Sequence, residues 1–141
     1  MKEYSNFSID YKKSKGRVFS EKEDSFRTCF MRDGDRIIHS SAFRRLKYKT
    51  QVFVHHEEDY FRTRLSHSLE VSQLSRSISK VFNINDDLTE SISLSHDLGH
   101  TPFGHAGEEV LNKKMIGKGG FNHNYQALKI LTVLEKKIFR F

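Results

Sequence analysis

Residues 95–108 read Ser95-His96-Asp97-Leu98-Gly99-His100-Thr101-Pro102-Phe103-Gly104-His105-Ala106-Gly107-Glu108. This stretch holds three histidines, an aspartate, a glutamate, three glycines and the only proline of the protein. Segments with apolar residues at helical spacing lie on both sides of it. So many proton-transfer and metal-binding groups between two helical segments indicate a functional site rather than a solvated loop.

The segment before this stretch is predicted to be an amphipathic helix. It opens with the cap-like run Asn85-Asp86-Asp87. Leu88, Ile92 and His96 then follow at i, i+4 and i+8, which places the histidine on the buried stripe. Asp97 lies one position further round the helix. Neighbouring His and Asp side chains at the end of a helix can converge on one metal ion.

Two helix-breaking residues separate this helix from the next one. Gly99 frees the backbone, and Pro102 disfavours helical geometry in the residue before it. In the following helix, His105 and Glu108 are spaced i, i+3, so their side chains share one face. A lone buried histidine is usually a core residue. An adjacent His-Asp pair followed by two further histidines and a glutamate favours a metal or catalytic site instead.

A second helix is predicted to supply another inward histidine. Its apolar stripe consists of His67, Val71, Leu74, Ile78 and Val81. Two separate helices then each offer one inward histidine, as a metal bound between facing helices requires. Arg64 lies one turn before His67 on nearly the same face, where a guanidinium can hold a phosphate oxygen beside the metal.

The rest of the sequence predicts an all-α protein with one short exception. Residues 1–16 are polar and lysine-rich, which is typical of a mobile arm. The cap-like run Ser20-Glu21-Lys22-Glu23 favours a short helix, and Ile38, Ala42 and Leu46 form one apolar line of another. The β-branched and aromatic run Thr50-Gln51-Val52-Phe53-Val54 predicts an extended or hairpin segment near residues 50–56.

A last helix is predicted after Gly117-Lys118-Gly119-Gly120, with Asn122 as its cap and His123 in its first turn. Its expected buried side consists of Tyr125, Leu128, Leu131, Leu134 and Ile138. On sequence alone, an exposed position beside the helix cap explains His123 as well as a functional role does.

Composition limits the class of protein. The chain has 141 residues, enough for one domain, and a formal net charge of +6, which favours phosphate-bearing partners or simply a soluble basic surface. The single cysteine excludes an internal disulfide and suits a reducing cytoplasm. No apolar run approaches the roughly twenty residues that span a membrane, and the N-terminus has no signal-peptide core. We therefore expect a cytoplasmic protein.

Four motifs together resemble the HD-domain metal-dependent phosphohydrolases, and among them the bacterial deoxyguanosinetriphosphate triphosphohydrolase (dGTPase) family. The resemblance covers roughly Arg27 to Glu135. The motifs are Arg36-Ile37-Ile38-His39-Ser40 through Phe43-Arg44-Arg45-Leu46 with Thr50-Gln51-Val52-Phe53; Tyr60-Phe61-Arg62-Thr63-Arg64-Leu65-Ser66-His67-Ser68; residues 96–108; and Gly120-Phe121-Asn122-His123-Asn124. The long third motif in this order with the other three is highly specific.

The resemblance implies a helical HD-domain core around one divalent metal ion. It implies that His67, His96 and Asp97 are metal ligands, that His105 and Glu108 handle the attacking water and proton transfer, and that Gln51, Arg64, His100 and His123 contact the substrate. In this family the reaction splits a dNTP into deoxynucleoside and inorganic triphosphate. Mixed nitrogen and oxygen ligation admits Mn, Mg, Co, Fe or Zn.

One implied ligand has no counterpart in this chain. In relatives the fourth metal ligand is an aspartate on a later helix, but no aspartate follows His123 here. We therefore expect residues 17–141 to be the N-terminal part of an HD-domain dNTP triphosphohydrolase. The missing ligand would come from another chain, from solvent or from a substitute such as Glu70. We also expect exposed apolar faces around Leu65–Val81 and Tyr125–Ile138, and hence a homo-oligomer or a complementing chain.

Three functions compete at this point. The first is a dGTPase-like hydrolase. The second is a remnant or subunit that binds nucleotide and metal without turnover. The third is a basic nucleic-acid-binding module, which is the weakest because no nucleic-acid motif is present and the basic residues are spread along the chain.

Overall fold

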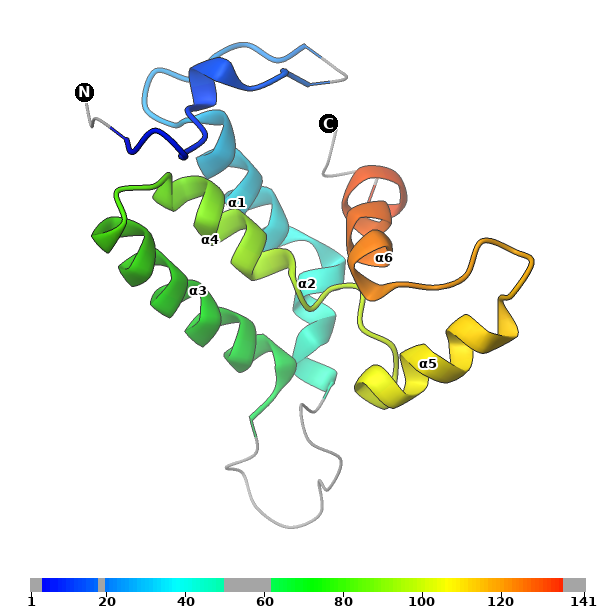
Figure 1. Cartoon of the computed structure of the whole chain (residues 1–141). Helices are drawn as coiled ribbons and strands as arrows, with labels where there is room; N and C mark the ends of the chain where they lie inside the picture. Colours follow the sequence, from blue (N-terminus) through cyan, green and yellow to red (C-terminus); the bar gives the residue numbers. More distant parts are fainter. Residues whose placement is uncertain (1–3, 18–19, 50–61, 136–141) are drawn as a thin grey trace.

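Helices form every regular element that the structure describes (Figure 1). The computed structural model describes residues 4–17, 20–49 and 62–135. The helices are α1 (Cys29–His39), α2 (Ser41–Arg45), α3 (Arg64–Val81), α4 (Asp86–Ser95), α5 (Gly104–Lys114) and α6 (His123–Lys129). Short 3-10 turns lie at Tyr11–Lys13 and Leu46–Tyr48, and a π-helical turn at Ile130–Leu134 follows α6. The predicted all-α class is confirmed, whereas the extended segment predicted near residues 50–56 lies outside the described residues.

Helix α4 lies between α1 and α3 and packs against both (Figure 1). Its interface with these helices is built largely from buried serines, namely Ser68, Ser72 and Ser79 of α3 and Ser91 and Ser93 of α4. Ser91 Oγ donates to the Phe30 carbonyl at 2.8 Å, and Ser93 Oγ donates to the Thr89 carbonyl at 2.7 Å. Small side chains allow the helices to approach closely. The two hydrogen bonds satisfy the hydroxyls of Ser91 and Ser93, whereas Ser68 Oγ is buried without a partner.

The apolar core lies at the end of α4 from which the chain leaves toward α5. It consists of Ile37, Phe43, Leu46, Leu94, Leu98 and Ala127, with Ala42, Leu65, Ile130 and Leu131 packed against it. These residues come from α1, α2, α3, α4 and α6 and from the short segments that follow α2, α4 and α6. The core therefore holds the carboxyl end of α4 in place, where His96 and Asp97 follow the helix.

The predicted buried stripes are partly wrong for three helices, although Leu131 packs against the core as predicted. Leu74, Ile78 and Val81 of α3, Ile92 of α4, and Tyr125, Leu128 and Leu134 at the C-terminal end of the described chain are each more than half exposed. Serine, alanine and leucine side chains face inward in their place, because α4 approaches its neighbours through small residues. Apolar faces were also predicted to be exposed around Leu65–Val81 and Tyr125–Ile138. The exposed residues just named confirm this for the described part of both ranges.

Two predicted helices differ at their boundaries. Residues 20–26 are not helical, because Thr28 caps α1 by accepting from the Met31 amide, and Glu21 instead pairs with Arg36. The apolar line through Ile38 is interrupted by Ser40. This serine ends α1 and caps α2, since its Oγ accepts from the Phe43 amide at 3.0 Å.

The N-terminal segment is tied to the connection between α3 and α4. The Ser5 amide donates to the Asn83 carbonyl at 2.8 Å, and the Asn85 amide donates to Ser8 Oγ at 2.9 Å. Asn85 also caps α4 through the Leu88 amide, as predicted. The mobility proposed for residues 1–16 stays a prediction. In the described part of the chain, no helix is long and apolar enough to cross a membrane.

Gly99 sets the distance between the end of α4 and α6, which provides a test of the packing. A Cβ at Gly99 would overlap the His123 carbonyl and lie 2.5 Å from the Ala127 amide nitrogen, so Gly99→Ala should push α6 away and lower the free energy of unfolding by about 3 kcal/mol. Gly117 has open space but a φ of +80°, so the control Gly117→Ala should cost only about 1 kcal/mol. Urea unfolding measures both; equal losses would contradict this packing.

Candidate metal and catalytic site

His67, His96 and Asp97 meet where α3 faces the end of α4. His67 lies in the first turn of α3, His96 is the C-terminal cap of α4, and Asp97 follows it. One ligand atom from each lies within 4.8 Å of the others, and the two imidazole centroids are 5.3 Å apart. The structure therefore brings together the three residues predicted to be metal ligands.

Asp97 is the most deeply buried charged group of this cluster, with 2% of its surface exposed. Arg64 Nη1 donates to its Oδ2 at 3.0 Å. Its other oxygen, Oδ1, lies 3.5 Å from His96 Nε2 and 3.3 Å from His100 Nε2. A buried carboxylate needs such compensating partners, because an isolated buried charge is costly.

The two histidines of the cluster have nitrogen lone pairs available for a ligand. His96 Nδ1 lies 2.6 Å from the Ser93 carbonyl, which can only accept, so Nδ1 carries the proton and Nε2 keeps its lone pair. His67 Nδ1 is buried without a hydrogen-bond partner. Burial also lowers the pKa of His67 and favours its neutral form, which is the form that binds metals. These nitrogen and oxygen donors suit a divalent cation.

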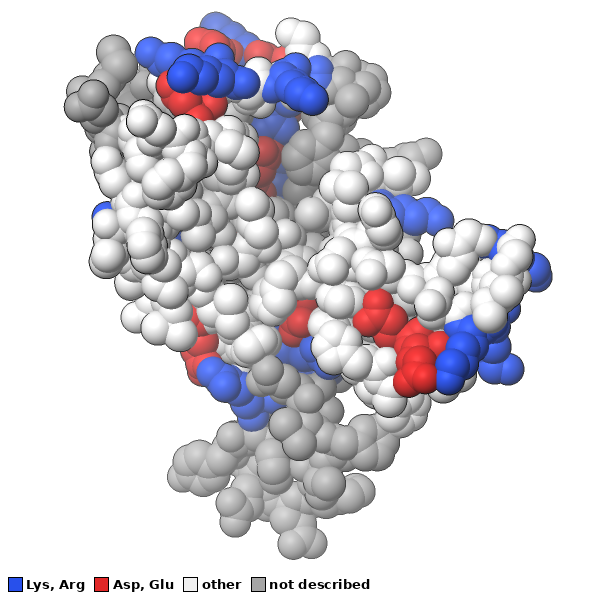
Figure 2. Space-filling model, in the orientation of Figure 1, with Lys and Arg blue, Asp and Glu red and all other residues white. Residues whose placement is uncertain are grey.

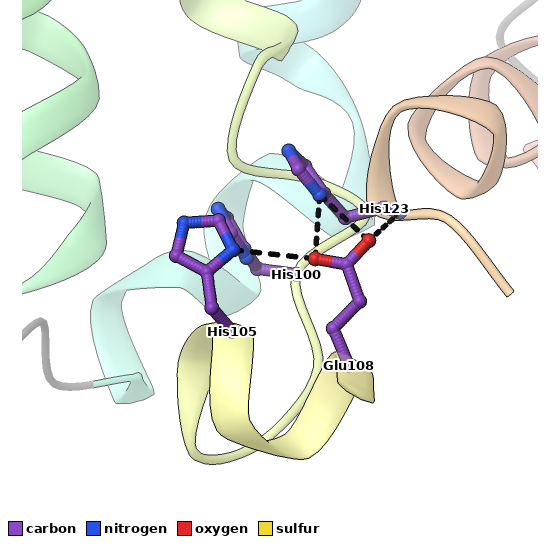
Figure 3. Close-up of side chains that lie close together, drawn as sticks. All are labelled: His100, His105, Glu108 and His123. Atoms are coloured by element: carbon purple, nitrogen blue, oxygen red, sulfur yellow. Dashed lines mark hydrogen bonds and ion pairs between the residues drawn. The ribbon is translucent and has the colours of Figure 1, made fainter. Parts of the chain in front are cut away.

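A second group of side chains gathers around Glu108 (Figure 3). The His123 backbone amide donates to Glu108 Oε1 at 2.9 Å, and His123 Nδ1 lies 2.8 Å from Oε2. His105 Nδ1 lies 3.3 Å from Oε2, so the predicted pairing of His105 with Glu108 along α5 is confirmed. The amide and imidazole of His123, helped by His105, lower the pKa of Glu108 to about 2.

His100 connects the two groups. Its ring stacks on His123 with centroids 4.3 Å apart and an angle of 8°, while its Nε2 faces Asp97 Oδ1. His100 Nδ1 is buried without a hydrogen-bond partner. Burial lowers the pKa of His100, so the neutral imidazole is favoured. This link was not predicted, although the i, i+3 spacing of Asp97 and His100 at the end of a helix was a signal for it.

Two other predicted residues lie outside these groups. Gln51 is outside the described residues, so its predicted contact with the nucleotide has no structural counterpart here. Glu70, suggested as a substitute ligand, is paired with Arg62 and is not one of the residues grouped with His67. Arg64 was expected beside the predicted metal ligands and contacts one of them, Asp97, although this pairing was not anticipated.

Comparison with known proteins agrees with this geometry. Residues 64–139 match the sequence profile of the HD domain. The chain is 59% identical over 141 residues to a deoxyguanosinetriphosphate triphosphohydrolase-like protein of Pelagibacter ubique, covering 100% of this chain and 38% of that protein. It is 62% identical over 128 residues to a protein of the same description from Parvibaculum lavamentivorans, covering 91% of this chain and 32% of the relative. The chain thus spans about a third of the length of these curated relatives.

The hydrogen bonds around Glu108 predict how its ionisation affects stability. Its pKa in the folded chain lies below the ordinary value of 4.5, so the stability that its carboxylate contributes is present above pH 4.5 and is lost as the pH falls toward 2. Carbon-13 NMR titration of the metal-free chain should give a pKa of about 2 for Glu108. His123→Ala should move it toward 4.5, whereas the exposed control His39→Ala should not. A wild-type pKa near 4.5 would contradict these contacts.

Proposed function

Because the chain belongs to the HD domain family, we propose that it is a metal-dependent phosphohydrolase that splits dGTP or other dNTPs into deoxynucleoside and inorganic triphosphate. The name of the relatives supports this substrate class. The observation that carries the proposal is the meeting of His67, His96 and Asp97 within 4.8 Å, next to a His105–Glu108 pair. Binding groups and proton-transfer groups are thus within reach of one substrate.

In this proposal His67, His96 and Asp97 hold the divalent ion. The bound ion would supply Lewis-acid chemistry, lowering the pKa of water and polarising a phosphoryl oxygen. The donor set supports this assignment, since His67 Nδ1 lacks a partner and His96 Nε2 keeps a lone pair. The ion would be Mn, Mg, Co, Fe or Zn, among which these donors do not select.

Arg64 is proposed to bind the substrate phosphates. One of its nitrogens donates to Asp97, and the guanidinium has further N–H groups that can donate to phosphate oxygens. Charge-assisted hydrogen bonds of this kind stabilise the negative charge that builds up on a triphosphate leaving group. Gln51, His100 and His123 are proposed as further substrate contacts, the two histidines because they lie between Asp97 and Glu108.

His105 is proposed to transfer the proton, with Glu108 as its positioning partner. Glu108 only accepts hydrogen bonds, so His105 Nδ1 carries the proton and Nε2 is free to accept another. The His105 side chain is 80% exposed and therefore open to water and substrate. Imidazole changes charge near neutral pH, and the Glu108 carboxylate stabilises the imidazolium as it forms.

A second candidate is a chain that binds metal and nucleotide without turnover. The observation that favours it is the number of ligands, because the group around His67 has three among the described residues. A fourth ligand from another chain would instead favour the first candidate. The exposed Leu74, Ile78 and Val81 of α3 form an apolar surface that a homo-oligomer or a complementing chain would cover.

A nucleic-acid-binding role is less well supported by the charge distribution. On the face shown in Figure 2, Lys and Arg side chains lie in separate groups with Asp and Glu beside them. Nucleic-acid-binding proteins instead gather basic residues into one patch or stripe that follows the phosphate backbone.

The proposal predicts metal-dependent turnover by this chain. With dGTP and Mn²⁺ or Co²⁺, the purified protein should release deoxyguanosine and triphosphate, and His105→Ala should lower kcat about 100-fold or more, as expected for loss of a general acid or base. The control His39→Ala replaces an exposed histidine of α1 and should keep full activity. Chromatography of the products measures both. Metal and dGTP binding without products would favour the second candidate, and activity that survives His105→Ala would contradict the role of His105.

A further inference from the structure

We propose that His100, His105, Glu108 and His123 form a second binding site for a divalent transition metal, separate from His67, His96 and Asp97. One ligand atom from each of the four lies within 4.8 Å of the others. The residues come from the loop after α4, the first turns of α5 and the start of α6 (Figure 3). Metal binding at this second site does not depend on whether the chain carries out the proposed hydrolysis.

The first argument is that two imidazoles face the same carboxylate. His105 Nδ1 lies 3.3 Å and His123 Nδ1 lies 2.8 Å from Glu108 Oε2 (Figure 3). A divalent ion between these three atoms would replace the protons that the two nitrogens direct at the carboxylate, and each imidazole would then carry its proton on Nε2.

His100 supplies the strongest evidence for a missing ligand. Asp97 Oδ1 lies 3.3 Å from His100 Nε2 and fixes the proton there, so the lone pair is on Nδ1. That atom is buried and has no hydrogen-bond partner. Buried nitrogen atoms without partners are costly and rare in folded proteins, and a bound cation would satisfy this one.

The second argument is the close packing of the three rings. His100 stacks on His123 at 4.3 Å, and the His105 ring lies 5.1 Å from His100 and 5.5 Å from His123. Three imidazoles with one carboxylate are ligands that Zn²⁺, Co²⁺ and Ni²⁺ accept, whereas Mg²⁺ prefers oxygen. The negative charge of Glu108 partly neutralises such an ion.

The site is open and adjustable enough to take up an ion. The His105 side chain is 80% exposed, so an ion can reach it from solvent. Zn–N bonds of about 2.0 Å in a tetrahedron place ligand atoms about 3.3 Å apart, which requires a small inward shift from 4.8 Å. Helix α5 has no buried residue, so it can move by this amount without disturbing the core.

Occupation of this site would have one chemical consequence. An ion bound to His105 Nδ1 would leave the ring proton on Nε2, the nitrogen that the proposed hydrolysis needs as a proton acceptor, so excess transition metal would inhibit. This consequence rests on the proposed function, whereas metal binding itself is measured without any nucleotide.

The number of bound ions tests the proposal. The full chain is stripped of metal, loaded with Co²⁺, desalted and analysed by elemental analysis and by Co²⁺ absorption. His105→Ala should lose one equivalent of Co²⁺ relative to the wild type, and His67→Ala should lose a different one, so that the double variant loses two. The control His39→Ala should lose none. If His105→Ala binds as much Co²⁺ as the wild type, the second site is absent.

A further measurement separates loss of ligands from loss of fold. His105 is mostly exposed, so His105→Ala should keep the wild-type helical circular dichroism. In the His67→Ala background, the remaining Co²⁺ should show the strong visible absorption of a four-coordinate site, and His105→Ala should abolish it. Absorption that persists in the double variant with unchanged helical signal would overturn the assignment.

Discussion

The ion pair between Arg64 and Asp97 is the interaction on which the rest of the site depends. Arg64 begins α3 and Asp97 follows α4, so their 3.0 Å contact joins the two helices at the point where the histidines meet. Their side chains are only 11% and 3% exposed. Removing one partner of a buried pair leaves an uncompensated charge, which is far more costly than losing a surface ion pair. This contact therefore fixes His67 against His96.

Small residues make this contact possible. Buried serines let α3 and α4 approach closely, and Gly99 lets α6 approach the end of α4. That second approach brings His123 to Glu108 and stacks it on His100. The two groups of histidines are thus products of one packing arrangement, in which glycine and serine replace the large apolar residues of an ordinary helix interface.

Sequence reasoning predicted the contacts that follow from local spacing. The pairing of His105 with Glu108 and the caps at Asn85 and Asn122 depend on residues a few positions apart, and all were confirmed. The predicted buried faces of α3, α4 and α6 were partly wrong, because apolar periodicity identifies a stripe but not the neighbour that covers it. The outward Leu74 and Ile92 illustrate this, since serines occupy the described interfaces in their place. The stacking of His100 on His123 depends on tertiary packing and had no local signal, whereas the contact of His100 with Asp97 follows an i, i+3 spacing.

The central claim is that imidazoles from α3 and α4 and the neighbouring carboxylate bind one cation together. Anomalous X-ray diffraction from crystals of the Mn²⁺-loaded chain measures this most directly. The account predicts an anomalous peak within bonding distance, about 2.0 to 2.3 Å, of a nitrogen of His67, a nitrogen of His96 and an oxygen of Asp97. A fully loaded crystal without a peak between these three side chains would contradict it.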